Sequence, residues 1–484
     1  MDTPTHFEDN FPPLKERYII LAIVLLGILM SVIDGNVVSI ALPTITQFFN
    51  VDVAISQWTI TAYLLTMTSL LLVFGKVSEY TGKTRLFLVG FIIFTLSSLA
   101  CGLSTNMVEL IAFRVAQGFG AAMVFSISGA IIYEVFPVSE RGRAMGFLGS
   151  TVAIGSIAGP VLGGILIDTL GWQYIFLINV PIGILLLALS FVYLKIQELK
   201  VEVFRMDWWG SLFLIIAMTS LMLCLGTLAD RVVFGYLQAA LAVIFTLATV
   251  ALIYREMHFE HPILDITIFY DLKFTLPAVS MILFFIANFM LSVVSPFYFE
   301  EAMGYSPYQI GFIFLVIPVI MVFGSPIFGW VYDKTHSGYL AAIGMGIVAA
   351  AYLVLGFLTH TQSLLLILLA FAISGIGGSM YQSPNNTEMM SAVPRRKLAT
   401  ASSVTSTMRN MGMALGVSFT SILIAVKLHI SGYDGPIGDA GGPLLVEVTT
   451  LVMFVAGFLC IASAIAALLR KIWADREKKA QKSE

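Results

Sequence analysis

Long apolar runs, separated by short polar connections, divide this chain almost from end to end. Because a helix needs about 20 mostly apolar residues to cross the hydrocarbon core of a bilayer, each run predicts a membrane-spanning helix. Lipid offers no hydrogen-bond partner to exposed backbone groups, and the runs lack the alternating pattern of a transmembrane barrel. The fourteen predicted spans are 18–41, 55–74, 85–103, 107–133, 143–167, 173–194, 208–228, 232–254, 272–299, 308–332, 338–359, 362–390, 398–427 and 445–470.

The distribution of lysine and arginine gives an independent test of this count, because cytoplasmic loops hold an excess of these residues. With the N-terminus inside, only Arg231 and Lys427 fall in outer connections, and Arg114 and Arg409 fall within spans. All the others of the 26 basic residues lie on the inner side. One span more or fewer would invert every later connection, so the pattern predicts an even count with both termini cytoplasmic. The first run is too long for the core of a signal peptide and is expected to remain.

Composition agrees with an all-α polytopic membrane protein. Of the 484 residues, 58% are hydrophobic and 11% are charged, whereas a soluble domain carries about 25% charged residues. The net charge of −3 lacks the basic footprint of a nucleic-acid-binding protein. The three cysteines, Cys101, Cys224 and Cys460, lie in apolar segments without metal-ligand spacing, so we expect packing residues and no metal site.

Two short sequences recur at nearly the same offset. Gly-Lys-Val-Ser-Glu at 75–79 closes the second span, and Gly-Trp-Val-Tyr-Asp at 329–333 closes the tenth, 254 residues later. Gly-Phe-Gly at 118–120 corresponds to Gly-Ile-Gly at 375–377, 257 residues later. Transporters are often built from two related bundles, so the offset pairs spans 1–6 with spans 9–14.

This pairing predicts three regions. Residues 1–195 form a six-helix bundle, 196–271 an inserted hairpin with cytoplasmic linkers, and 272–484 a second six-helix bundle with a basic tail. The mixed charged and apolar segment 255–271 is suited to lie along the inner membrane surface. The outer connection 430–443 is either a structured flap or slack, and its turn-forming composition favours slack.

Two ionisable residues lie deep within spans of the first bundle, where a charge costs roughly 2.5–3.5 kcal/mol on insertion scales. Asp34 and Arg114 each lie about 10 Å from the outer end of their span, so they can meet at one depth. A carboxyl group in this position can change its protonation state between the two faces of a membrane. The pair is therefore a candidate proton-coupling site, with a static ion pair between helices as the alternative.

Further polar and aromatic residues in later spans are candidates to line a cavity for a lipophilic or cationic ligand. They are Asn288, Phe289, Phe297, Glu301, Tyr381, Gln382, Asn385, Glu388 and Arg409. Arg409 either contacts an anionic group or bonds to carbonyl groups across helices. Glu388 either serves the cavity or reaches inner water, and Glu301 is either a solvated helix end or part of a vestibule for cations.

Span 5 carries small residues on successive turns, which allow close helix approach, and a proline that opens its hydrogen bonding. They are Gly149, Gly155, Gly159, Pro160, Gly163 and Gly164.

Together these motifs resemble the major facilitator superfamily, and within it the fourteen-span drug:proton antiporter branch. Segment 75–85 looks like that family's loop between spans 2 and 3, although Glu79 replaces the usual Asp. Segment 114–118 looks like the span 4 motif whose arginine takes part in proton coupling, and 155–164 is similar to the span 5 motif of exporters. Asp34 followed by Ala-Leu-Pro at 41–43 resembles the span 1 signature.

The resemblance implies two bundles that rock around a central cavity, with a proton gradient as the energy source and without ATP or another cofactor. It implies gating residues at the inner face, which are Gly75, Glu79, Gly82, Lys83, Arg85, Arg141 and Asp333. It adds Gln57, Trp58 and Tyr63 to the candidate cavity residues. It also implies a monomer in the cell membrane, in contact with lipid and not with nucleic acid.

We therefore expect a proton-coupled exporter of lipophilic or cationic drugs. A dedicated exporter of one metabolite or lipid is the alternative within transport. A membrane enzyme or sensor is disfavoured, because no nucleotide loop, Ser/His/Asp arrangement or signalling module is found.

Overall fold

A computed structural model describes residues 11–51, 53–194, 206–230, 235–259, 266–305, 307–394, 397–433 and 441–483, and these ranges are almost entirely helical. The first half contains α1 (Leu14–Phe49), α2 (Val53–Ser56), α3 (Trp58–Thr81), α4 (Lys83–Gly102), α5 (Met107–Val135), α6 (Arg141–Thr169), α7 (Tyr174–Leu177), α8 (Asn179–Tyr193), α9 (Trp208–Asp230) and α10 (Tyr236–His258). The second half contains α11 (Leu272–Phe297), α12 (Pro307–Phe314), α13 (Val316–Thr335), α14 (Tyr339–Leu358), α15 (Leu364–Ser391), α16 (Leu398–Ile430) and α17 (Gly442–Ser483). Short turns of helix are η1 (Val138–Glu140), η2 (Ile266–Tyr270) and η3 (Tyr298–Ala302).

The all-α polytopic architecture is confirmed. Thirteen helices of the described ranges are long and apolar enough to cross a membrane. The predicted fifth span, 143–167, is the 29-residue helix α6, which is not among those thirteen. The count of fourteen spans therefore stays a prediction. Most of the predicted linker at 196–207, and residues 434–440 of the outer connection 430–443, lie outside the described residues.

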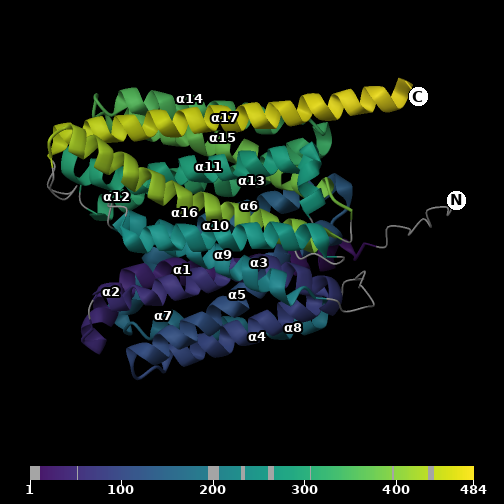
Figure 1. Cartoon of the computed structure of the whole chain (residues 1–484), viewed down its shortest axis with the longest axis horizontal. Helices are drawn as coiled ribbons and strands as arrows, with labels where there is room; N and C mark the ends of the chain where they lie inside the picture. Colours follow the sequence, from purple (N-terminus) through teal and green to yellow (C-terminus); the bar gives the residue numbers. More distant parts are fainter. Residues whose placement is uncertain are drawn as a thin grey trace.

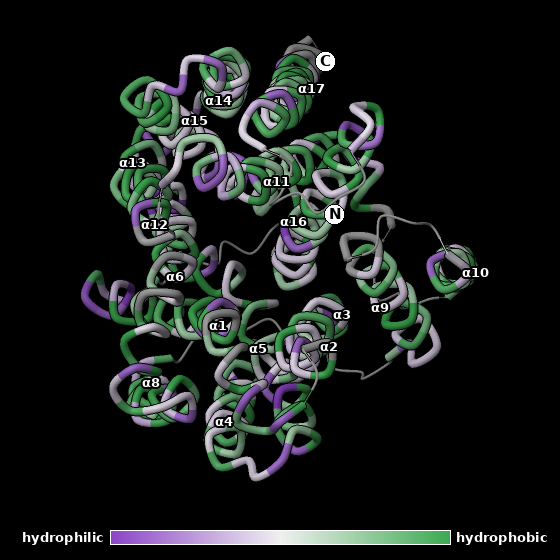
Figure 2. Tube along the Cα trace, turned by 90° about the vertical axis from the view of Figure 1, so that its left-hand side faces the viewer, coloured by the Kyte–Doolittle hydropathy of each residue, from purple (hydrophilic) through white to green (hydrophobic). Residues whose placement is uncertain are grey.

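The helices form two bundles that lie side by side (Figure 1). Helices α1 to α8 make up one, and α11 to α17 make up the other. The end-on view places α9 and α10 at the edge of the molecule, with α9 beside α3 and α16 and α10 outside α9 (Figure 2). Helix α9 bonds to both bundles. Ser69 Oγ of α3 lies 3.1 Å from Thr219 Oγ1, and Ser418 Oγ of α16 donates to Leu225 O at 3.0 Å. The hairpin thus bridges the bundles on this side.

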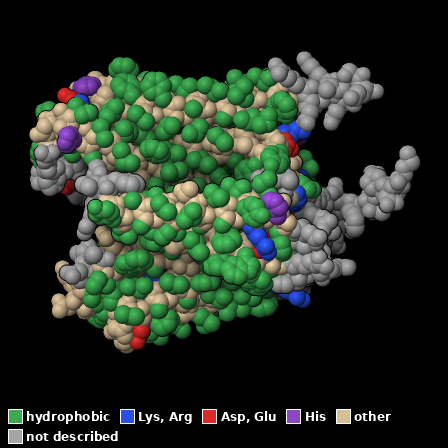
Figure 3. Space-filling model, viewed as in Figure 1, with side chains coloured by type: hydrophobic (Ala, Val, Ile, Leu, Met, Phe, Trp, Pro, Cys, Tyr) green, Lys and Arg blue, Asp and Glu red, His purple; other side chains and the backbone are tan. Residues whose placement is uncertain are grey.

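Apolar and basic side chains occupy different parts of the surface. Apolar side chains cover the long sides of the molecule, and most of the visible lysine and arginine side chains gather at the end where α1 begins and α17 ends (Figure 3). We call this the basic end; Lys83, Arg143 and Arg470 belong to it. The positive-inside rule predicts that the basic end faces the cytoplasm.

Close glycine contacts pack each bundle in the same way. A Cβ on Gly120 of α5 would lie 2.6 Å from Gly90 O of α4. In the second bundle a Cβ on Gly377 of α15 would lie 2.7 Å from Gly344 O of α14. Both pairs come from segments related by the repeat, so the repeated glycines serve the same helix contact in each bundle.

We predict that Gly120→Ala lowers the unfolding free energy by about 1–3 kcal/mol, because the added methyl group overpacks a backbone contact. Gly346→Ala is the matched control, because nothing lies within 4 Å of a Cβ there, and alanine favours a helix by about 0.5–1 kcal/mol over glycine. Thermal unfolding in detergent measures both. Equal effects of the two substitutions would contradict this packing.

Candidate functional site

The deepest charges of the first bundle form an ion pair. Asp34 of α1 and Arg114 of α5 are both 0% exposed, and Arg114 Nη1 contacts Asp34 Oδ2. Arg114 Nε also donates to Thr59 O at 2.7 Å. The two residues expected to share one depth are therefore in direct contact between two helices of one bundle.

Neutral polar groups hold the second carboxylate oxygen of Asp34. Gln117 Nε2 donates to Asp34 Oδ1 at 2.9 Å, and Asn179 Nδ2 of α8 donates to the same oxygen at 3.0 Å. Both amides also donate to Ser98 Oγ of α4, at 3.2 and 3.0 Å. Gln117 shares the face of α5 with Arg114 because it lies one helical turn further on. Four helices thus converge on one carboxylate, and every donor stabilises its ionised form.

A tyrosine separates this ion pair from the space between the bundles. The guanidinium carbon of Arg114 lies 4.2 Å from the centroid of the Tyr63 ring, a cation–π distance. The Tyr63 hydroxyl donates to Ser31 O at 3.0 Å. Tyr63 and Ser31 also line a cavity between the bundles, which we call the main cavity, whereas Asp34 and Arg114 do not.

The main cavity lies between the bundles and has a volume of about 370 Å³, within the range of small-molecule sites. Its wall combines α1, α3, α5 and α6 of the first bundle with α11 and α16 of the second, and Met222 of the hairpin completes it. Most lining side chains are apolar, and no Asp or Glu is among the lining residues that the structure describes.

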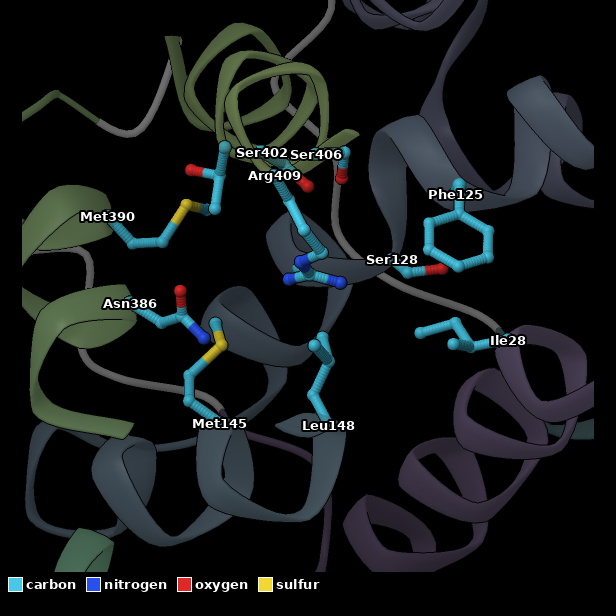
Figure 4. A pocket seen from close by; sticks show the side chains of 12 residues that line it. Ile28, Phe125, Ser128, Met145, Leu148, Asn386, Met390, Ser402, Ser406 and Arg409 are labelled. Carbon is cyan, nitrogen blue, oxygen red and sulfur yellow. The ribbon is translucent and has the colours of Figure 1, made fainter. Parts of the chain in front are cut away.

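A smaller cavity of about 30 Å³ adjoins it. Arg409 and Phe125 line both cavities. The small cavity lies nearer the basic end, since Ile28 precedes Ser31 in α1 and Ser402 precedes Arg409 in α16. Figure 4 shows the Arg409 side chain directed into this space, opposite Asn386 of α15.

The bundles close on each other at the basic end. The Asp333 carboxylate of α13 accepts the backbone N–H groups of Gly142 and Arg143 at the start of α6, at 2.7 and 2.9 Å. Ser383 Oγ of α15 donates to Gly142 O at 2.5 Å. A Cβ on Gly142 would lie 2.6 Å from Gly329 O, so the backbones meet without intervening side chains.

Helix α6 changes partner along its length. Its first half packs on α13, and its second half packs on α1. A Cβ on Gly155 would lie 2.8 Å from Val32 Cγ1, and one on Gly159 would lie 2.9 Å from Asn36 Cβ. These α1 residues flank Asp34, so the exporter-like motif contacts the helix that carries the buried acid.

Comparison with known proteins settles the family. A profile of the Major Facilitator Superfamily matches residues 24–417. The chain belongs to the major facilitator superfamily.

Two relatives illustrate the range within this superfamily. "Riboflavin transporter RibZ" of Clostridioides difficile (strain 630) is 32% identical over 415 residues, which cover 86% of this chain and 90% of that protein. "Probable multidrug resistance protein EmrY" of Escherichia coli (strain K12) is 30% identical over 401 residues, covering 82% and 78%. The multidrug relatives support the assignment of this chain to the drug:proton antiporter branch. This major facilitator protein is a transporter and not an enzyme.

A solved structure agrees in fold. The human organic anion transporter MFSD10 superposes with a TM-score of 0.61 at 14% identity, covering 93% of this chain and 100% of that chain. At this identity the likeness concerns the fold alone.

Several residues expected in the cavity of this major facilitator protein lie elsewhere. Tyr63, Phe289 and Arg409 line the main cavity. Trp58 is 44% exposed at the start of α3, and Gln57 before it and Glu301 in η3 are exposed too. Those that lie outside the lining of the two cavities are Gln57, Trp58, Asn288, Phe297, Glu301, Tyr381, Gln382, Asn385 and Glu388.

The residues of the second bundle that lie outside the two cavities make contacts with neighbouring helices. Asn288 Nδ2 donates to Tyr352 OH at 3.4 Å, and Asn385 Nδ2 donates to Pro277 O at 3.2 Å. The Tyr381 ring packs 4.9 Å from that of Phe284. Gln382 is buried against Gly149. Glu388 is buried and forms an ion pair with Arg470 of α17 rather than reaching inner water.

The expected gating residues cluster at the basic end. Glu79 accepts from Thr400 Oγ1 of the other bundle at 2.5 Å, and a Cβ on Gly75 would clash with Ser403. Lys83 pairs with Glu134 at 2.9 Å.

Their neighbours shape the connections. Gly82 ends α3 with a φ of 91°, which a side chain would disfavour. Arg141 Nε donates to Tyr133 O and Phe136 O at 3.0 and 3.1 Å. Arg85 is exposed. Their roles in gating stay predictions.

The exporter-like motif divides between buried and open positions. A Cβ on Gly163 would lie 2.7 Å from Val37 Cγ2, whereas nothing lies within 4 Å of one on Gly164. The side chain of Pro160 lies outside the described part of the chain.

The sequence analysis did not identify the polar side chains around the Asp34 carboxylate or the asparagines that line the two cavities. Ser98, Gln117 and Asn179 surround the carboxylate, and Asn386 and Asn410 line the cavities. The only available signal was the position of Gln117 and Asn179 within family-like motifs.

We predict that Asp34→Ala lowers the unfolding free energy by about 3–5 kcal/mol, because it leaves the Arg114 charge buried and unpaired. Removing both charges, in Asp34→Ala with Arg114→Met, is expected to cost less than Asp34→Ala alone. Denaturation of Asp34→Ala, Arg114→Met and the double variant in detergent measures this. A double variant as unstable as the sum of the single variants would contradict an energetically coupled pair.

Proposed function

We propose that this transporter exports lipophilic small molecules from the cytoplasm in exchange for protons, with Asp34 as the proton carrier. The observation that supports it best is the buried Asp34–Arg114 ion pair beside a mostly apolar cavity between the bundles. The relatives named as multidrug resistance proteins support the same class of substrate.

The geometry of the ion pair suits proton coupling. An ionised Asp34 accepts bonds from Arg114, Gln117 and Asn179. Protonation removes the attraction to Arg114 and leaves a buried cation uncompensated, which is costly. The two protonation states therefore favour different arrangements of α1 and α5, as a carrier of coupled protons requires.

The transport cycle follows from the closed basic end. With Asp34 ionised, the contact between Asp333 and the start of α6 keeps the cytoplasmic side shut. A proton from outside neutralises Asp34, weakens its link to Arg114 and favours opening to the cytoplasm. Release of the proton there accompanies binding of substrate and returns the bundles to the present arrangement.

The cavity supports a lipophilic body in the substrate. Phe125, Phe289, Met222 and Met413 contribute apolar, adaptable surface, and flexible methionine suits ligands of varied shape. A positive charge on the substrate has no carboxylate to meet among the described lining residues. The proposal therefore keeps lipophilic substrates and does not require that they be cationic.

A second candidate is dedicated transport of one metabolite. The observation that favours it is the 32% identity to a riboflavin transporter over 86% of this chain. Riboflavin joins a flat aromatic ring system to a polar chain, and the cavity offers aromatic and polar groups together.

We predict that Asp34→Asn lowers the rate of gradient-driven uptake of ethidium or rhodamine 123 into proteoliposomes with an acidic lumen by at least tenfold. The variant cannot release a proton, whereas dye exchange without a gradient should persist because Asp34 does not line the cavity. Asp168→Asn, which changes an exposed acid, is the matched control and should transport normally.

Gradient-driven uptake that survives in Asp34→Asn would contradict the assignment of the proton carrier. Uptake of riboflavin without uptake of either dye would select the dedicated transporter. Dye fluorescence and riboflavin fluorescence are followed in the same vesicles.

A further inference from the structure

Arg409 is a buried cation without a counter-charge among the residues that the structure describes. Its side chain is 5% exposed, and its Nε has no hydrogen-bond partner. The nearest charge-compensating contact is the Phe285 ring, 5.7 Å from the guanidinium carbon. Among the residues that the structure describes, no carboxylate pairs with it. A charge at this depth is expensive, so its isolation requires an explanation.

Three other buried or half-buried cations of the chain are each paired with a carboxylate from another helix. The pairs are Arg114–Asp34, Lys83–Glu134 and Arg470–Glu388. Each links helices within one bundle. Arg409 differs because it faces a cavity rather than a neighbouring helix. Its counter-charge is therefore expected to arrive from the cavity.

Asn386 faces Arg409 and is equally unsatisfied. It is 3% exposed, and neither its side-chain nitrogen nor its oxygen has a hydrogen-bond partner in the described part of the chain. Both residues line the small cavity, and Figure 4 shows their polar ends directed into the same space. Buried polar groups are normally hydrogen-bonded, so two unpaired groups around one hollow indicate a site for a polar ligand group.

The size of the hollow limits that group. Its volume of about 30 Å³ corresponds to roughly two or three water-sized positions at about 10–15 Å³ each. A carboxylate has two oxygen atoms and fits this space, and guanidinium binds carboxylate with two parallel hydrogen bonds. The amide nitrogen of Asn386 offers a further donor.

We propose that this transporter prefers lipophilic molecules that carry one carboxylate, which Arg409 and Asn386 bind in the small cavity while the lipophilic body fills the adjoining 370 Å³ space. This inference deepens the proposed export of lipophilic molecules and rests on it for the identity of the cargo. The carboxylate site is separate from the proton site, because Tyr63 lies between Arg114 and the main cavity.

A double-mutant cycle tests the site without any ligand. Asn386→Asp places a carboxylate opposite Arg409 and should raise the thermal unfolding midpoint of the full-length protein. In an Arg409→Gln background the same substitution buries an unpaired acid and should lower the midpoint. An equal shift in both backgrounds would overturn the proposal, because the two residues would then not share one site.

A matched pair of dyes tests the ligand chemistry. Rhodamine 110 has a free carboxylate, and rhodamine 123 is its methyl ester on the same ring system. In detergent, rhodamine 110 should stabilise the wild-type protein at a concentration at least tenfold lower than rhodamine 123, since a ligand that binds the folded state raises its stability. Arg409→Lys should keep part of this preference, and Arg409→Gln should lose it. Lys15→Gln, an exposed cation, should change nothing.

Equal shifts with both dyes, no shift with either, or a preference that persists in Arg409→Gln would overturn the carboxylate site. The failure of proton coupling gives a different result. Wild-type protein that prefers the free acid in binding but shows no gradient-driven uptake of either dye would reject the proposed antiport and leave the carboxylate site in place.

Discussion

A charge buried in the apolar interior of this protein needs a compensating group, and the positions of these groups organise the molecule. Asp34 and Arg114 compensate each other inside the first bundle. Glu388 and Arg470 do the same in the second. Removing one member of such a pair costs far more than the pair contributes, so protonation of one carboxylate is a large local perturbation. Arg409 has no carboxylate partner within the described ranges, which makes the small cavity receptive to an acid from outside the chain.

Helix α6 connects the buried acid to the contact between the bundles. Gly155 and Gly159 bring α6 against the part of α1 that carries Asp34, and Gly142 brings its other end against α13. Because glycine leaves no side chain between the backbones, α1 and α6 are closely packed. A displacement of α1 would therefore move α6 and be transmitted to the basic end. The hydrogen bonds of Asp333 to the start of α6 are the contact that such a shift would break.

Hydrophobic patterning predicted the helices, and the sequence repeat paired glycines of the two bundles whose equivalent helix contacts appear only in the structure. Asp34 and Arg114 were predictable because charges in apolar runs are rare and their depth can be counted along a helix. The polar shell of Asp34 was not, because the face on which Ser98 or Asn179 lies depends on how the helices pack.

Helix α15 illustrates this limit. Asn385 bonds to Pro277 within the second bundle, whereas Asn386 lines the small cavity, although only a rotation of about 100° separates them. Likewise, a sequence does not distinguish a paired buried arginine such as Arg114 from the unpaired Arg409. The repeat indicates that a hairpin is inserted but not that α9 packs between α3 and α16.

The claim that the charge on Asp34 controls the contact between the bundles is tested most directly by measuring the distance between the bundles at the basic end while that charge is changed. Spin labels replace the exposed Arg143 of α6 and Lys334 of α13 in a background without the three native cysteines, and pulsed electron paramagnetic resonance measures the distance between them. We expect one short distance when Asp34 is ionised, and a second, longer population at acidic pH or in Asp34→Asn. Identical distance distributions in the wild type and in Asp34→Asn at both pH values would contradict it.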